Sequence, residues 1–155
     1  MRLVVDGCDG VGKTTIAKML CSNYGLDYAH CTNRDPTDWN FYSNIIRKDD
    51  ILWDRHCVSE LVYPRFFGRE QLMSFQQVEL LVAGSGAKFI IFSCPDDVLY
   101  DRLMRRGEEH VEVLDNFISI NRMFCELGDR LGIPVVDTSS TGIDEIFSLV
   151  EGFDN

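Results

Sequence analysis

The residues with the strongest chemical pattern lie in a glycine-rich segment near the amino terminus. Residues 7–14 read Gly-Cys-Asp-Gly-Val-Gly-Lys-Thr and fit the pattern G-x-x-x-x-G-K-[ST]. Glycines let backbone N–H groups turn toward phosphate oxygens, and a helix after the segment adds its positive N-terminal end. The pattern predicts a site for a nucleoside triphosphate such as ATP. We expect its lining to be Gly7, Gly10, Val11, Gly12, Lys13, Thr14 and Thr15.

Four side chains are expected to act on the triphosphate. Lys13 should reach the β- and γ-phosphates, and the hydroxyl of Thr14 should bind Mg²⁺. Asp54 ends a short apolar run and so should lie at the edge of a sheet where ligands bind. It could orient Mg²⁺ through water or hold the acceptor. The next residue, Arg55, could neutralise charge on the group in transfer.

A group of arginines follows at Arg102, Arg105 and Arg106. The spacing i, i+3 and i+4 puts them on one face of a helix that Gly107 should end. Arginine binds phosphate oxygens in pairs, so these residues predict a mobile lid, at about 102–112, that closes over the triphosphate and excludes water. The alternative is a solvated helix face on which neighbouring acidic residues pair with the arginines.

Short apolar runs alternate with longer stretches of helical periodicity. Strands are expected at 2–6, 26–30, 50–54, 88–93 and 133–137, and helices at 13–24, 37–48, 57–63, 70–83, 95–106, 109–131 and 143–151. Apolar strands between helices are typical of a buried parallel sheet. We therefore expect the α/β class. One domain should span residues 1–155, with a doubly wound, five-stranded parallel sheet and helices on both faces.

Composition narrows the class of protein. The 155 residues are 45% hydrophobic and 26% charged, which is ordinary for a globular protein. No apolar run is long enough to span a membrane and no signal-peptide pattern is present, so we expect a cytoplasmic protein without membrane contact. The six cysteines lack close C-x-x-C spacing and should be free thiols. A net charge of −10 disfavours a long polyanion as partner and favours a small anionic molecule.

Four segments, in the same order, resemble motifs of the thymidylate kinases. Residues 6–15 are similar to E-G-x-D-G-x-G-K-[ST]-T, and residues 32–36 to T-R-E-P with one inserted residue. Residues 54–59 resemble D-R-Y-x-x-S, and residues 102–107 the lid motif R-L-x-x-R-G. The resemblance implies a P-loop NTPase fold and phosphoryl transfer from ATP with Mg²⁺. It leaves a homodimer open, because thymidylate kinases are commonly dimers. The compact form is similar to that of phage-encoded nucleotide kinases, which would place the protein in a host cytoplasm.

The resemblance also implies roles for single residues. Asp6 stands where deoxynucleoside kinases carry a catalytic glutamate, and Asp9 where thymidylate kinases place an acidic residue near the sugar hydroxyl and the metal. His56 replaces a tyrosine used near the sugar, and Tyr63 matches a position beside the base or sugar. Thr138 lies in a loop where the resemblance implies an adenine contact. The expected catalytic set is Asp6, Asp9, Lys13, Arg55, Arg102 and Arg106.

The sequence identifies the acceptor of the phosphoryl group less clearly than the donor. A monophosphate needs cations to bring two anions together, whereas a sugar hydroxyl needs a carboxylate base beside it. Five arginines between residues 34 and 69 favour a deoxynucleoside monophosphate; they are Arg34, Arg47, Arg55, Arg65 and Arg69. Residues expected to bind this substrate are Asp9, Arg34, Trp39, Arg47, Asp54, Arg55, His56 and Tyr63.

Two other functions stay open. One is a kinase that phosphorylates a hydroxyl of a deoxynucleoside, or of a hydroxymethylated base in phage DNA, with Asp6 as the base. The negative net charge weighs against the DNA version. The other is a nucleotide-binding module that regulates a partner protein.

Cys8 offers a separate prediction, because it lies in the phosphate loop near a helix N-terminus. That position should lower the pKa of its thiol. Bound ATP should then protect Cys8 from alkylation.

Overall fold

A parallel sheet forms the centre of the structure, a computed structural model that describes residues 1–153. Its strands are β1 (Arg2–Gly7), β2 (Asp27–His30), β3 (Ile51–Asp54), β4 (Lys88–Ser93) and β5 (Val135–Asp137). They lie in the order β2-β3-β1-β4-β5, and each neighbouring pair is parallel. All five expected strands are present, so the prediction of a five-stranded parallel sheet is confirmed.

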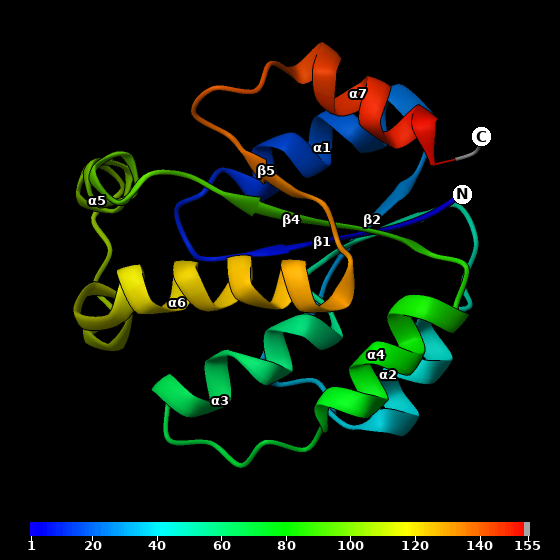
Figure 1. Ribbon diagram of the computed structural model, residues 1–155, viewed down its shortest axis with the longest axis horizontal. Helices are drawn as coiled ribbons and strands as arrows, with labels where there is room; N and C mark the ends of the chain where they lie inside the picture. The colour runs from blue at the N-terminus through cyan, green and yellow to red at the C-terminus, as the bar shows by residue number, and fades with distance from the viewer. Residues whose placement is uncertain (154–155) are drawn as a thin grey trace.

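Helices connect the strands and cover both faces of the sheet, as expected. They are α1 (Lys13–Tyr24), α2 (Trp39–Ile45), α3 (Tyr63–Phe66), α4 (Phe75–Gly84), α5 (Asp96–Arg105), α6 (Val111–Leu131) and α7 (Ile143–Gly152), with a 3-10 helix, η1, at Cys57–Leu61. Figure 1 shows α1 and α7 on one face and α3, α4 and α6 on the other. α5 lies beyond the carboxyl end of β4 (Figure 1). Among the described helices, none has the length and apolar character needed to cross a membrane.

Local side chains set three helix boundaries that periodicity alone misplaced. α2 begins at residue 39 rather than 37, because the carboxylate of Asp38 accepts a hydrogen bond from the backbone N–H of Phe41. α4 begins at residue 75 rather than 70, because Ser74 and Gln77 form a capping box. The helix expected at 57–63 is replaced by η1 and then α3, in which Pro64 occupies the first turn.

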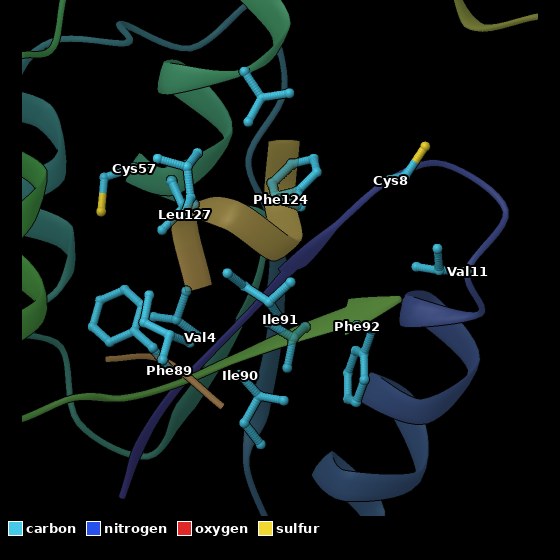
Figure 2. Packing of buried hydrophobic residues seen from close by; sticks show 14 of the residues in the cluster. Val4, Cys8, Val11, Cys57, Phe89, Ile90, Ile91, Phe92, Phe124 and Leu127 are labelled. Carbon is cyan, nitrogen blue, oxygen red and sulfur yellow. The ribbon is translucent and has the colours of Figure 1, made fainter. Parts of the chain in front are cut away.

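Buried side chains on both faces of β4 pack the sheet against the helices on its two sides. In Figure 2, Phe89 and Ile91 face the side of α6, from which Phe124 projects, whereas Ile90 and Phe92 face the side of α1. All five side chains are at most 5% exposed. Each contributes about 1.5–3 kcal/mol relative to an exposed position. A strand covered on both faces explains why β4 reads as a continuous apolar run.

The chain leaves β1 at Gly7, where a side chain would not fit. Its φ is +138°, and a Cβ atom there would lie 2.2 Å from the carbonyl oxygen of Phe92 in β4. Glycine therefore lets the two strands stay close while the chain turns into the phosphate loop. The register pairs Val5 of β1 with Asp54 of β3. The loop and Asp54 consequently emerge at the same edge of the sheet.

Candidate active site

Two adjoining cavities open at the carboxyl edge of the sheet. The larger has a volume of about 760 Å³ and the smaller about 360 Å³. The phosphate loop lines the smaller cavity, with Gly10, Gly12, Lys13, Thr14 and Thr15. Residues that line both cavities mark where the two meet; they are Asp9, His30, Arg55 and Arg106. The cavity at the phosphate loop thus adjoins a second, larger cavity.

Lys13 is held in place by the phosphate loop itself. The residue is buried, and its Nζ donates a hydrogen bond of 2.9 Å to the carbonyl oxygen of Cys8. Burial and then the nearby Arg55 lower the pKa of Lys13, whereas Asp9 and Asp54 oppose the shift. An ammonium group in this desolvated position interacts more strongly with phosphate oxygens than it would in water.

Thr14 and Asp54 form the part of the site that fits a metal ion. The Thr14 hydroxyl donates a hydrogen bond of 2.7 Å to Oδ2 of Asp54. The other carboxylate oxygen, Oδ1, is buried and has no hydrogen-bond partner among residues 1–153. A free oxygen beside a hydroxyl suits Mg²⁺, which takes few protein ligands and completes its shell with phosphate and water. Nowhere in the described part of the chain do three or more His, Cys, Asp or Glu side chains gather to hold a metal.

Asp54 is held from the neighbouring edge strand β2. The register pairs His30 with Asp54, and Nδ1 of His30 lies 3.6 Å from Oδ2. Tyr28 donates a hydrogen bond of 2.8 Å to the same oxygen. Burial alone would raise the pKa of Asp54, but His30, Lys13, Thr14 and Tyr28 together hold it well below its usual value. Asp54 lines the smaller cavity alone, so it lies beside the phosphate loop and away from the larger cavity.

Asp9, Arg55 and Tyr63 are joined where the two cavities meet. Arg55 forms an ion pair with Asp9, and its guanidinium carbon lies 4.7 Å from the centre of the Tyr63 ring. The Tyr63 hydroxyl donates a hydrogen bond of 3.1 Å to the other oxygen of Asp9. Burial would raise the pKa of Asp9, but Arg55, Lys13 and Arg106, with the Tyr63 hydrogen bond, outweigh it and lower the pKa. Asp9 is therefore a charged group that orients Arg55. Because its pKa is lowered, Asp9 is a weak base.

The backbone at Arg55 turns its side chain toward the loop. Its φ is +70°, a left-handed conformation that costs a non-glycine residue about 1–2 kcal/mol. The N–H of Arg55 donates a hydrogen bond of 2.9 Å to the carbonyl oxygen of Val5 in β1. This bond fixes the turn at the end of β3. The guanidinium can then reach Asp9 in the phosphate loop.

The three lid arginines have different positions. Arg102 donates hydrogen bonds of 2.8 Å to the hydroxyl of Thr138 and 3.1 Å to the carbonyl oxygen of Val11. It therefore ties α5 to the phosphate loop and to the loop after β5. Arg106 lines both cavities, whereas Arg105 is exposed and lines neither. The expectation that all three face the triphosphate is corrected for Arg105, because it points to the solvent side of α5.

Asp6 lies beneath the site rather than on its surface. It is 1% exposed and lines neither cavity. Its carboxylate accepts hydrogen bonds from the Ser59 hydroxyl at 2.5 Å and from the backbone N–H of His56 at 3.2 Å. Burial raises its pKa to about 7, although Ser59, Lys13, Arg55 and His56 oppose the shift. Ser59, which bonds to Asp6, lines the larger cavity, but Asp6 itself does not, so its expected direct catalytic contact is corrected.

Two residues expected to bind the acceptor line neither cavity. His56 has no exposed surface, and its ring nitrogens have no hydrogen-bond partners in residues 1–153. Its ring centroid lies 4.7 Å from that of Tyr42, and burial lowers its pKa to about 3. Trp39 is half-buried against the core and lines neither cavity. The prediction for His56 fails because the chain turns into η1 directly after Arg55, which directs residue 56 into the apolar layer.

Three of the five expected arginines also lie away from the two cavities of the site. Arg47 is exposed in the turn between α2 and β3, at the amino ends of the strands and thus at the edge opposite the phosphate loop. Arg34 is exposed in the loop after β2, where residues 32–33 line the larger cavity in its place. Arg69 does line that cavity. Arg65 is exposed too and lines neither of these cavities. The larger cavity therefore keeps Arg55 and Arg69 of the five expected arginines, and loses Arg34, Arg47 and Arg65.

Cys8 is buried rather than reactive. Figure 2 shows it on the loop that leaves β1, and its sulfur lies 3.8 Å from the carbonyl oxygen of Phe117 in α6. Burial, and then Asp9, raise the pKa of its thiol to about 12, outweighing Lys13 and Arg55. The prediction of a lowered pKa is wrong, because the side chain packs beneath α6 instead of facing the phosphate site. All six cysteines are free thiols, as expected.

The larger cavity contains residues outside the expected set. They include Tyr42, Ser59, Glu60 and Phe67. The sequence offers a signal by which Ser59 and Glu60 can be found, because they are polar residues inside the apolar segment 57–63. The sequence offers no such signal for Tyr28 and His30, since their contact with Asp54 depends on which strand lies beside β3.

Comparison with known proteins supports a kinase. No protein-family model matches the chain. A protein named cytidylate kinase 2, from Borreliella afzelii, is 32% identical over 169 aligned residues, which cover 97% of this chain and 94% of that protein. The YorR protein of Bacillus subtilis, solved with phosphorylated GDP, has a TM-score of 0.83 at 21% identity, covering 99% and 95% of the two chains. A deoxyadenosine kinase from M. mycoides, solved with the products dCMP and dCDP, has a TM-score of 0.61 at 15% identity, covering 98% and 97%.

The two kinds of match carry different weight. At identities of 21% and 15%, the solved structures show the fold alone. The Borreliella relative is 32% identical along nearly the whole of both chains, which shows common family membership. A phosphate loop leading into α1 and a strand-end carboxylate beside it agree with that membership. The chain belongs to the P-loop nucleoside and nucleotide kinases.

Proposed function

We propose that the protein transfers the γ-phosphoryl group of ATP to a deoxynucleoside monophosphate. The observation that carries this proposal is that Arg55 and Arg106 lie where the phosphate-loop cavity meets the larger cavity. Two cations at this boundary suit an acceptor that brings its own negative charge. They offset the repulsion between the two phosphate-bearing substrates and neutralise the group in transfer.

The donor half of the site would be formed by the phosphate loop and the lid. Lys13 binds the β- and γ-phosphates, while the Thr14 hydroxyl and the free oxygen of Asp54 hold Mg²⁺. The metal, when bound, neutralises phosphate charge. A hydrogen bond from Arg102 holds Thr138 beside the phosphate loop, and we propose that Thr138 faces the adenine. Residues 102–112, at the junction of α5 and α6, act as the lid of one kinase domain.

The acceptor half needs no proton-abstracting base. An oxygen of the acceptor phosphate attacks the γ-phosphorus, the bond to the β–γ bridging oxygen breaks, and ADP leaves. Arg55 and Arg106 bind the acceptor phosphate, and Asp9 with Tyr63 keeps Arg55 in place. The nucleoside then extends into the larger cavity.

A hydroxyl acceptor is the second candidate, and one observation favours it. The pKa of Asp6, raised by burial to about 7, would suit a general base. Asp6 lines neither cavity, however, and Asp9 has a lowered pKa. The structural neighbour from M. mycoides carries the name deoxyadenosine kinase, so this candidate belongs in the same test.

The test is ADP release from ATP and Mg²⁺ across an acceptor panel. The panel holds the deoxynucleoside monophosphates, the free deoxynucleosides, and DNA with and without hydroxymethylated pyrimidines. We expect stimulation by a monophosphate, and its loss in Lys13→Ala. Stimulation only by a nucleoside or by modified DNA would transfer the catalytic role to Asp6. ATP binding without any stimulation would point to a regulatory module instead.

A further inference from the structure

The larger cavity has an inner part that lies beyond the phosphate junction. Asp9, His30, Arg55 and Arg106 line both cavities, so they mark the end nearest the phosphate loop. Glu60, Tyr42, Phe67 and Arg69 line the larger cavity alone. A nucleotide whose phosphate lies at the junction must therefore place its base toward this inner part. This step rests on the function proposed above.

Glu60 is the carboxyl group of that inner part, and half of it is unpaired. The residue is 5% exposed, and its Oε1 accepts a hydrogen bond of 3.1 Å from the Tyr42 hydroxyl. Its Oε2 is buried and has no hydrogen-bond partner in residues 1–153. Burial raises the pKa of Glu60, while Tyr42, Arg69 and the nearby Thr37 oppose the shift. The Thr37 hydroxyl lowers the pKa of Glu60 through a weak side-chain hydrogen-bond contribution, but its geometry leaves Oε2 without a hydrogen-bond partner among residues 1–153.

An unpaired buried oxygen is unfavourable until a donor reaches it. A ligand N–H group would be such a donor. Because Oε2 has no accessible surface in the ligand-free chain, the carboxyl group must rotate toward the cavity to meet it. Catalytic sites commonly tighten in this way when substrate binds.

We propose that Glu60 selects a nucleotide whose base carries an exocyclic amine, and rejects thymine and uracil. An amino group, as on C4 of cytosine or C6 of adenine, presents its hydrogens to the carboxyl oxygen. Thymine and uracil place a carbonyl oxygen at C4, so acceptor would face acceptor. Their N3–H lies between two carbonyl oxygens, which repel an approaching carboxylate. A site built around one buried polar group rejects the analogue that leaves this group unpaired.

The test compares acceptors that differ only in this group. The pairs are dCMP with dUMP, 5-methyl-dCMP with dTMP, and dAMP with dIMP. ADP release is measured for the native protein, for Glu60→Gln, and for Glu70→Gln as the control. Glu70 is exposed and lines neither cavity. For each variant we also measure ATP binding by calorimetry, and folding by thermal unfolding.

We expect the amino member of the preferred pair to have the higher kcat/KM. Glu60→Gln should lower that kcat/KM by about ten- to a hundredfold, the effect of one lost hydrogen bond to a charged group. It should lower the kcat/KM of the keto member much less, and Glu70→Gln should change neither. Preference of the native protein for dUMP or dTMP would overturn the proposal even if Glu60→Gln does not fold. An equal loss for both members would also overturn it, and ATP binding with no active monophosphate would refute the proposed function itself.

Discussion

The hydroxyl of Tyr28, on the edge strand β2, lies 2.8 Å from Oδ2 of Asp54, the carboxylate that ends β3. The same oxygen accepts the hydrogen bond of Thr14 at 2.7 Å, which leaves Oδ1 free. Burial, and then the hydrogen bond to Asp54, raise the pKa of Tyr28 to about 12, so it stays a donor at neutral pH. Tyr28 therefore orients the oxygen that we propose to face Mg²⁺.

Tyr28→Phe should weaken the binding of ATP in the presence of Mg²⁺ by about three- to tenfold, the effect of one hydrogen bond to a carboxylate. Binding in EDTA should not change, because Tyr28 does not line the phosphate-loop cavity. Isothermal calorimetry with and without Mg²⁺ measures both constants. Tyr24→Phe is the matched control, since its hydroxyl bonds to the carbonyl oxygen of Phe147, away from the site. Equal weakening in EDTA would show that Tyr28 has a general structural role.

Arg55→Ala should impair use of the acceptor more than binding of ATP. The guanidinium lies at the boundary of the two cavities and is held by Asp9 and Tyr63. Losing it should lower kcat/KM for the monophosphate by about ten- to a hundredfold, with the dissociation constant of ATP changed by no more than about twofold. Steady-state kinetics in each substrate and ATP calorimetry separate the two effects. Arg105→Ala should leave both unchanged, and loss of ATP binding alone in Arg55→Ala would contradict this role.

The sequence predicts the fold well, because the fold depends on local patterns. The G-x-x-x-x-G-K-[ST] segment and the apolar run of β4 each determine their own element. Arg55 directly follows the end of β3, and the structure places it where the two cavities meet. These inferences need only neighbours in the chain and the general geometry of parallel sheets.

The site is predicted less well wherever a side chain depends on distant partners. His56 follows Arg55 in the chain, yet it is buried against Tyr42 and Phe89. Arg47 has the charge expected of an acceptor residue, but the crossover through α2 places it at the wrong edge of the sheet. Tyr28 could be assigned only once β2 was known to pair with β3. Residue type gives the chemistry, but strand order decides which side chains meet.

Cys8 should resist alkylation whether or not ATP is bound. Its side chain has no exposed surface and its pKa is raised to about 12, so little thiolate is present at neutral pH. Cys21 and Cys125 are only partly buried and should react first. Mass spectrometry of peptides after timed iodoacetamide treatment measures each site. Rapid labelling of Cys8 that ATP suppresses would place the thiol in the phosphate site instead.

Asp6 should make the protein less stable as pH rises from about 4 to about 7. The pKa of Asp6 rises from 3.8 in a fully solvated side chain to about 7 in the folded chain, so in this range the folded state holds a proton that the unfolded state has lost. The slope of the unfolding free energy with pH is then negative. The full effect is at most about 4 kcal/mol, at 1.36 kcal/mol per pKa unit. The stabilisation from the bound proton is fully present below the pKa of Asp6 in the unfolded chain. It is lost as pH rises through the pKa of Asp6 in the folded chain.

Urea unfolding of the native protein and of Asp6→Asn, measured at several pH values, tests this slope. The unfolding free energy of the native protein minus that of Asp6→Asn should fall as pH rises toward 7, because Asn cannot ionise. Asp27→Asn is the control, since Asp27 is exposed at the start of β2. Parallel pH curves for the native protein and Asp6→Asn would show that Asp6 ionises in the folded state much as it does in water.

His56→Phe should fold with a stability within about 1 kcal/mol of the native protein. Neither ring nitrogen has a hydrogen-bond partner in the described part of the chain, so an apolar ring loses no side-chain bond. The hydrogen bond from the backbone N–H of residue 56 to Asp6 remains. His56→Ala, in contrast, should cost about 2–4 kcal/mol, because it leaves a cavity among Tyr42, Trp53 and Phe89. Urea unfolding measures both variants, and the kcat/KM of folded His56→Phe for the acceptor should match that of the native protein. A selective rise in the acceptor KM of His56→Phe would return this histidine to the substrate site.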